Sequence, residues 1–302
     1  MRRSSVSTRV RCLSSLRLSD ADIEALEVEG VTGAAPWSSA ADIDRRRTLG
    51  RAGGSRYRGE ACGRVRRYDR FGVCVRRGVV AEGVQVTLCG SDAGRARAAA
   101  DRLGHGTTWL VADLTVPDQA ERFVVEAAER SGGIDILVTN GPGPRPGTVL
   151  ETPAAEYQAA LDRSLHAVVR MCLAAVPVMR AARWGRIVAI TSLGVLRPYR
   201  NLALSNTARA GAAGFLRTLA AEVAADGVTV NSVLPGVHAT DRARAIYGQG
   251  EALAAALAAI PAGRLGQPSE LAAAVAFLCS ELAGYVTAVE LPVDGGAGRA
   301  LT

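Results

Sequence analysis

Residues that can contact a polar ligand lie at the ends of several short apolar segments in this sequence. Asp113 follows the segment Thr108–Ala112, and Ser192 follows Arg186–Thr191. A carboxylate accepts hydrogen bonds and a serine hydroxyl both donates and accepts them, so these two residues suit recognition of a polar small molecule. Seven further candidates lie beside the ends of these or similar segments: Ser91, Leu114, Asn140, Gly141, Pro235, Gly236 and Thr240.

The elements that must position these residues follow a regular order. From about Ala81 onward, short β-branched runs alternate with longer amphipathic stretches, which is typical of a parallel sheet covered by helices on both faces. The predicted strands are Val84–Cys89, Thr108–Ala112, Ile134–Thr139, Arg186–Thr191, Val228–Val233 and Ala288–Val293. The predicted helices are Ala93–Leu103, Pro117–Ser131, Ala155–Arg183, Ala203–Ala225 and Ser269–Leu282. This is a doubly wound α/β fold, whose ligands bind outside the carboxyl ends of the strands.

The first eighty residues differ from the rest. They carry clusters of Ser and Arg and most of the excess positive charge behind the net +7, but no apolar run with strand or helix spacing. We therefore divide the chain into an irregular basic segment, residues 1–78, and a Rossmann-like domain, residues 79–302. A nucleic-acid-binding tail is the less favoured alternative, because its arginines are spread among acids without interleaved aromatic residues.

Composition narrows the class of protein. The chain has 302 residues, of which 48% are hydrophobic and 22% are charged, as in globular proteins with a large core. No uncharged apolar run is long enough to span a membrane, and the N-terminus lacks the apolar core of a secretion signal, so we expect a cytoplasmic protein. The six cysteines are scattered, which predicts reduced, buried thiols and no disulfide framework or zinc site.

Several motifs in this order and spacing resemble the short-chain dehydrogenase/reductase family. They are Asp113-Leu114-Thr115, Asn140-Gly141, Ile187–Ser192, Asn231–Gly236 with Thr240, and Val293–Gly296. The resemblance covers roughly residues 75–297, and the ending Gly263–Glu270 looks like the 3-oxoacyl-carrier-protein reductase branch. It implies a Rossmann-like oxidoreductase that uses NAD(P)(H) on a small carbonyl or alcohol. It also implies a homodimer or homotetramer formed through the two long helices.

The resemblance assigns roles to the residues near the cofactor. The family's residue matching Asp113 accepts a hydrogen bond from the adenine amino group, although the same side chain could instead cap the following helix. Asn140 and Gly141 match a turn where the backbone approaches the ligand, and an ordinary turn explains them equally well. Pro235, Gly236 and Thr240 match the segment that closes over the nicotinamide and pyrophosphate.

The family's proton-donating pair is missing. In the family, a tyrosine made more acidic by a nearby lysine protonates the carbonyl, and a serine hydrogen-bonds the same oxygen. Ser192 matches that serine, but Leu202 and Asn206 occupy the tyrosine and lysine positions. The chain contains no lysine, so no realignment restores the pair. Tyr199 is the remaining candidate donor, with an arginine as its cation.

Three details complete the predicted site. The candidate cations for Tyr199 are Arg200 and Arg209. Ser164 stands where the family has an asparagine in the long helix after the fourth strand. Ser91 is neutral where an arginine often selects a 2′-phosphate, and since no acid ends the second strand, NADP is slightly favoured over NAD.

The family's glycine-rich phosphate loop also has no clear counterpart. Its glycines should fall near positions 66, 70 and 72, and only Gly72 is present. Val31–Ala35 resembles the opening of the motif but lies about fifty residues before Gly83, so we interpret it as a chance match. The codons of Arg67–Gly72, read one base later, can spell Val-Thr-Thr-Gly-Ser. We therefore hypothesise that the segment before about Val79 is translated out of frame.

These losses leave three hypotheses. One is that the chain is a damaged product that folds poorly, because the family's first strand, which lies centrally in the sheet, is degraded and its loss would expose unpaired edges. The other two concern function. Ser192, Asp113 and Thr240 favour an oxidoreductase with an atypical active site. Leu202, Asn206 and the missing glycine loop favour a catalytically inactive Rossmann-fold protein that binds a ligand or stabilises a partner subunit.

Overall fold

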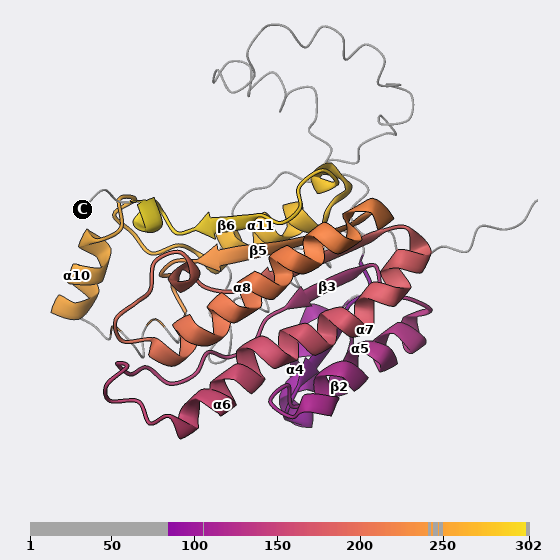
Figure 1. The fold of residues 1–302 in the computed structure, drawn as a ribbon, viewed down its shortest axis with the longest axis horizontal. Coiled ribbons are helices and arrows are strands. Elements are labelled where there is room, and N and C mark those ends of the chain that lie inside the picture. Colours follow the sequence, from indigo (N-terminus) through magenta and orange to yellow (C-terminus); the bar gives the residue numbers. More distant parts are fainter. Residues whose placement is uncertain (1–83, 105, 241–242, 244–246, 248–249, 300–302) are drawn as a thin grey trace, which may run out of the picture. The chain divides into compact units, whose positions relative to one another are not determined.

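The structure is a computed structural model that describes residues 84–104, 106–240, 243, 247 and 250–299 (Figure 1). The predicted irregular segment 1–78, the positions expected for the phosphate loop and the motif Val31–Ala35 all lie outside the described residues. The described part is an α/β structure of parallel strands and helices, so the predicted Rossmann-like class is confirmed.

The first sheet has two parallel strands, β1 (Thr87–Gly90) and β2 (Thr108–Val111), connected by α4 (Ala93–Leu103). Helix α4 begins where it does because the Asp92 carboxylate accepts a hydrogen bond from the backbone N–H of Arg95 at 2.8 Å. A small core of alanines and leucines joins the helix to β1.

The second sheet has four parallel strands in the order β3 (Ile136–Thr139), β4 (Gly185–Ile190), β5 (Val228–Pro235) and β6 (Glu290–Val293). Every residue of β4 is buried, as is nearly all of β5. This burial explains why their sequences read as continuous apolar runs, because a parallel strand covered on both faces has no solvent side.

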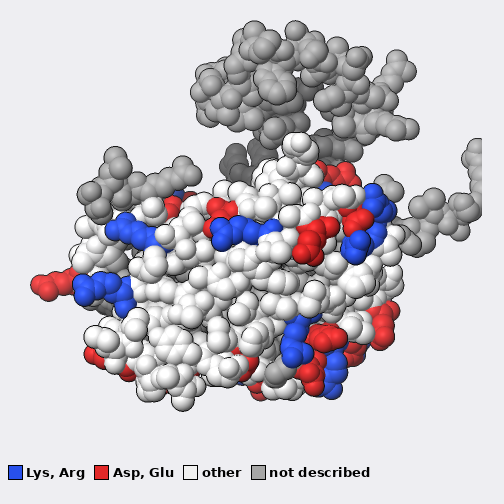
Figure 2. Space-filling view, viewed as in Figure 1, with Lys and Arg blue, Asp and Glu red and all other residues white. Residues whose placement is uncertain are grey.

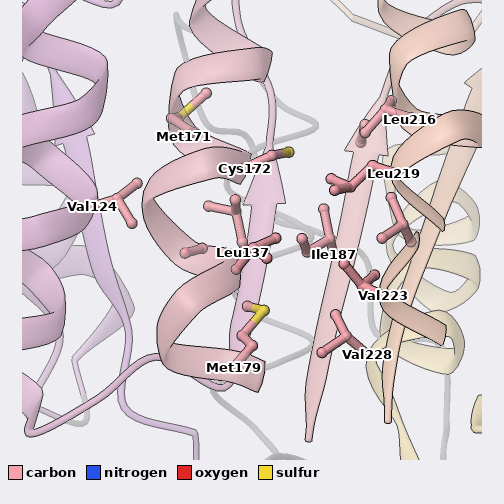
Figure 3. Packing of buried hydrophobic residues seen from close by; sticks show 14 of the residues in the cluster. Val124, Leu137, Met171, Cys172, Met179, Ile187, Leu216, Leu219, Val223 and Val228 are labelled. Carbon is pink, nitrogen blue, oxygen red and sulfur yellow. The ribbon is translucent and has the colours of Figure 1, made fainter. Parts of the chain in front are cut away.

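Helices cover both faces of the second sheet (Figure 1). On one face, α5 (Pro117–Ser131), α7 (Ala167–Ala182) and α8 (Ala203–Val223) pack on inward residues of β3, β4 and β5, and Figure 3 shows this core around Leu137 and Ile187. On the other face, α11 (Pro268–Cys279) packs against alternate residues such as Val188. The remaining helices are α6 (Ala155–Leu161) and α10 (Glu251–Ala258).

The long helix expected at Ala155–Arg183 contains an irregularity that the sequence did not predict. A π-helical turn, η2 (Asp162–His166), separates α6 from α7. The continuous stretch Ala155–Ala182 is long and apolar enough to cross a membrane by length and composition, with a mean hydropathy of 1.4. Its residues Met171, Cys172 and Met179 are buried against the sheet, so the stretch serves as a core helix of the fold (Figure 3).

Several predicted boundaries were wrong by a few residues. β1 begins at Thr87 instead of Val84, β3 begins at Ile136, and β5 continues to Pro235. β6 begins at Glu290, because Ala288 has a φ of 60° that does not fit an extended strand. At the helix ends, α8 stops at Val223 and α11 at Cys279.

The described strands fall into two sheets. β1 pairs with β2, and β3 pairs with β4, but no described strand lies between β1 and β3. The prediction of reduced, buried thiols is confirmed for Cys172 and Cys279, where burial raises the pKa of each thiol to about 12. Cys89 is also outside any disulfide, but it is only half-buried.

Candidate active site

A cavity of about 830 Å³ lies between β1 and β3 and reaches the carboxyl ends of three strands. Five predicted site residues line it: Ser91 after β1, Asp113 and Leu114 after β2, and Asn140 and Gly141 after β3. The structure therefore brings these residues together at the sheet edge where the fold predicts a ligand.

Asp113 is held in a tight turn by its own neighbours. Its Oδ1 accepts hydrogen bonds from the backbone N–H and the Oγ1 hydroxyl of Thr115, at 2.9 and 2.8 Å. These bonds are the main reason that the pKa of the Asp113 carboxyl lies below its ordinary value, and the positive charge of Arg163 lowers it further. The helix-cap alternative was wrong, because α5 has Val116 at its N-cap and no side-chain cap. Asp113 is thus an ionised carboxylate beside the cavity.

Arg163 is a site residue that the sequence reasoning missed. It lies in the π-helical turn and lines the cavity together with Asp113, Asn140 and Gly141. Its Nε is buried and has no hydrogen-bond partner among the residues that the structure describes. The sequence offered one signal for Arg163: it immediately precedes Ser164, which stands where the family has an asparagine.

The candidate catalytic residues meet around Gly194, in the short 3₁₀ turn η3 (Leu193–Val195) that follows β4. Ser192 Oγ accepts a hydrogen bond from the Gly194 N–H at 3.1 Å, and Asn206 Nδ2 donates to the Tyr199 carbonyl at 2.7 Å. A methyl group on Gly194 would lie 2.6 Å from Asn206 Oδ1, 3.3 Å from Ser192 Oγ and 3.5 Å from the Tyr199 ring. Only glycine leaves room for these three side chains to converge.

The surroundings of Tyr199 differ from the expected ones. Burial, together with Tyr247 and Asp294, raises the pKa of its hydroxyl to about 12, and the positive charge of Arg197 opposes this shift. The nearby cation is thus Arg197, not Arg200 or Arg209 as predicted. A tyrosine with this pKa keeps its proton at neutral pH but is a weak acid.

Arg209 of α8 has a different role. Its Nη1 donates hydrogen bonds to the carbonyls of Ile190 and Thr191, at 2.9 and 2.7 Å. It also lines a small hollow with Arg163 and Ser164, beside the main cavity. A guanidinium group is therefore fixed to the peptide group that immediately precedes Ser192, between the cavity and the Gly194 cluster.

The predicted residues after β5 do not line the main cavity. Pro235 pairs with Val293 of β6, and a methyl group on Gly236 would lie 2.7 Å from the Cα of Asp294. Thr240 is buried, and its Oγ1 accepts from the backbone N–H of Ala243 at 3.2 Å. Close packing against β6 thus explains the glycine at 236 without a ligand.

The fold and this edge of the sheet define a Rossmann-like oxidoreductase class, and the comparisons with known proteins agree. The family model described as "Enoyl-(Acyl carrier protein) reductase" matches residues 71–298. The chain belongs to the short-chain dehydrogenase/reductase family, whose members use a nicotinamide cofactor.

Within that family the chain is similar to 3-oxoacyl-[acyl-carrier-protein] reductases. It is 37% identical to the enzyme of Vibrio cholerae over 65% of this chain and 80% of the relative. It is 35% identical to the enzyme of Escherichia coli over 72% of this chain and 88% of the relative. Among solved structures, levodione reductase superposes with a TM-score of 0.73 at 26% identity, covering 76% of this chain and 94% of that chain.

Proposed function

We propose that this protein is an NAD(P)(H)-dependent oxidoreductase that reduces a small carbonyl compound or oxidises the corresponding alcohol, with an atypical active site. The observation that carries the proposal is the shared edge of the sheet. Ser192 follows β4 next to a fixed cation, while Asp113, Asn140 and Gly141 follow neighbouring strands around the cavity. The resemblance of their motifs to the family's assigns all four to positions near the cofactor or the substrate.

The residues present fit the adenosine half of a nicotinamide dinucleotide. The ionised Asp113 carboxylate can accept a hydrogen bond from an adenine amino group, and Gly141 leaves the backbone open to close approach. Arg163, whose buried Nε has no partner, can bind an anionic phosphate. When bound, the cofactor supplies or accepts the hydride.

The proposed role of Ser192 is to hydrogen-bond the substrate oxygen. Its Oγ already accepts from the Gly194 N–H, so its hydroxyl hydrogen remains available as a donor. Tyr199 is the candidate proton donor, since Leu202 at the family's tyrosine position cannot donate. Because the pKa of Tyr199 is raised to about 12, we expect it to donate its proton to the substrate more slowly than the tyrosine of ordinary family enzymes does.

We also propose a preference for NADP over NAD. Ser91 lines the cavity directly after β1 and carries no negative charge that would repel a 2′-phosphate. Two arginines lie on the first turns of α4, Arg95 beside Asp92 at 3.4 Å and Arg97 beside Asp101 at 3.9 Å. Both remain exposed enough to turn toward an added phosphate.

A second candidate function is ligand binding without catalysis. Leu202 and Asn206 favour it, because Asn206 Nδ2 holds the Tyr199 carbonyl and provides no cationic group. In this case the protein would bind a nucleotide-like ligand or stabilise a partner subunit, and Ser192 would be a structural residue of the η3 turn.

The assembly and location belong to the same proposal. We propose a cytoplasmic homodimer or homotetramer that associates through α7 and α8. The face over these helices is largely uncharged across its middle (Figure 2). Leu173 of α7 is an apolar side chain that is 56% exposed. We also propose the division into an irregular segment 1–78 and a domain 79–302, of which the family match 71–298 covers nearly all of the domain and the last eight residues of the segment.

Cofactor titration tests the proposed function. NADPH and NADH are titrated separately into the full chain while nicotinamide fluorescence and melting temperature are followed, since a ligand that binds the native state raises its stability. Micromolar binding followed by turnover of a carbonyl panel supports the oxidoreductase. Binding without turnover, with parent and Ser192→Ala chains behaving alike, favours the inactive alternative. If the chain is folded but binds neither NADPH nor NADH, the proposed nicotinamide cofactor and the proposed NADP preference are both refuted.

A further inference from the structure

A small hollow lies beside the main cavity, where β3 and β4 end. The π-helical turn η2 and helix α8 contribute Arg163 and Arg209 to its wall. Its volume is about 20 Å³, which is room for one particle of the size of a water molecule. The size of the hollow therefore limits its occupant to a single water molecule or a monatomic ion.

The wall of the hollow carries two positive charges. Guanidinium groups stay charged in proteins, and no aspartate or glutamate is among the described residues that line the hollow with Arg163 and Arg209. Asp162 belongs to the same turn, but its Oδ1 accepts a hydrogen bond from His166 Nδ1 at 2.8 Å. Asp113 attracts Arg163 from the wall of the main cavity. The charge of the hollow therefore favours an anion over a cation.

Two residues of this wall have buried polar atoms with unused hydrogen-bonding capacity. Thr139 is 2% exposed, and within the described part of the chain its Oγ1 has no hydrogen-bond partner. The same holds for the Nε of Arg163. Burying such groups without a partner is costly, so an occupant that accepts hydrogen bonds would stabilise the hollow. Because a guanidinium group has several N–H donors, Arg163 can serve this occupant and a cofactor phosphate at once.

The two positive charges distinguish between the two possible occupants. A water molecule would satisfy some of the donors but leave the repulsion between the guanidinium groups in place. An anion accepts hydrogen bonds from the surrounding donors, and its charge offsets that repulsion, which is strong where little water screens it. We propose that the hollow binds a monatomic anion, such as chloride, between Arg163 of η2 and Arg209 of α8.

Such an anion would connect elements that carry the candidate active site. The turn η2 packs closely on α8, since a methyl group on Gly211 of α8 would lie 3.2 Å from Cδ2 of Leu165. Arg209 is fixed in turn to the end of β4, where its Nη1 donates to the carbonyls of Ile190 and Thr191. The bound anion would therefore hold the π-helical turn, α8 and the end of β4 in one arrangement.

The chloride dependence of the melting temperature tests the proposal on the full chain, with neither cofactor nor substrate present. The readout is therefore independent of any oxidoreductase activity. Chloride replaces gluconate, an anion too large for the hollow, at constant ionic strength. Because a ligand that binds the native state raises its stability, we expect a saturable rise of about 3 °C or more at ten times the Kd.

Two arginine variants locate the anion. Arg163→Gln removes one of the two charges of the hollow and should abolish the chloride-dependent rise. Arg170→Gln is the matched control, because Arg170 does not line the hollow and its Nη1 lies 3.5 Å from the Asp118 carboxylate. This variant should keep the rise of the parent chain.

Other outcomes would overturn the proposal. A melting temperature that is the same in chloride and gluconate, or that never saturates with chloride, would show that the hollow holds only water. A rise that persists in Arg163→Gln, or that is lost in Arg170→Gln, would place the anion elsewhere. If Arg163→Gln does not fold, crystals of the parent chain soaked in bromide decide the question. An anomalous scattering peak between Arg163 and Arg209 would support the proposal, and the lack of a peak there would overturn it.

Discussion

Adding a methyl group at Gly194 tests whether the candidate catalytic residues pack tightly around this position. In Gly194→Ala, the new methyl group would displace Asn206 and break its bond to the Tyr199 carbonyl, so we expect a loss of about 1–3 kcal/mol in unfolding free energy. The control is Gly214→Ala in α8, where nothing lies within 4 Å. Alanine there should add about 0.5–1 kcal/mol, because it restricts the unfolded chain. Denaturant unfolding measures the change in unfolding free energy of each variant. Equal changes in the two variants would contradict the tight packing of Ser192, Tyr199 and Asn206 around Gly194.

A charge at Ser91 tests the proposed cofactor preference. Ser91→Glu places a carboxylate at the cavity edge after β1, where it would repel a 2′-phosphate. We expect the Kd for NADPH to rise about tenfold, while the Kd for NADH changes less than twofold. Glu151→Gln, in an exposed loop distant in sequence from β1, serves as the control. An equal loss of both cofactors in Ser91→Glu would argue against the preference.

At the scale of elements, the start of α11 carries a pH-dependent contribution to stability. The Glu270 carboxylate accepts hydrogen bonds from Arg264 at 2.6 and 2.8 Å and from the Gln267 backbone N–H at 2.6 Å. These contacts lower the pKa of Glu270 to about 2. Since the folded pKa lies below the unfolded one, the stabilisation is complete above the ordinary pKa of 4.5 and is lost as the pH falls toward 2.

The variant Glu270→Gln isolates that contribution. It keeps an acceptor for the Gln267 N–H but removes the charge facing Arg264, so we expect a lower melting temperature than the parent at pH 7. The difference should shrink steadily between pH 5 and pH 2. Because both side chains are partly exposed, it should also shrink at high salt. A difference independent of pH would contradict the assigned cause.

The sequence predicted the elements better than it predicted their irregularities. The helices Ala93–Leu103 and Pro117–Ser131 were predicted without error, because their apolar spacing and end signals are local. The π-helical turn has no local sequence signal, and Arg163 was missed along with it. The ligand edge could be predicted, since the carboxyl ends of parallel strands meet there. The identity of the cation near Tyr199 could not be predicted, because it depends on how the loop packs.

At the scale of the whole molecule, the proposed association surface can be tested by charge. Leu173→Glu places a carboxylate on an exposed position of α7, and we expect the assembly to dissociate toward monomers. Leu150→Glu is the control, because Leu150 is 98% exposed and lies in the loop before α6, in neither α7 nor α8. Light scattering after size-exclusion chromatography gives the mass of each. A parent chain that is already monomeric would refute the proposed assembly.

The separate core of the first sheet also has a consequence for how the molecule unfolds. Within the described residues, β1, α4 and β2 share a small core of their own, separate from the larger cores around β4 and β5. Units with separate cores open with different free energies, so calorimetry should show two overlapping heat-absorption peaks instead of one. The smaller unit would open first, and with it would go half of the ligand-binding edge.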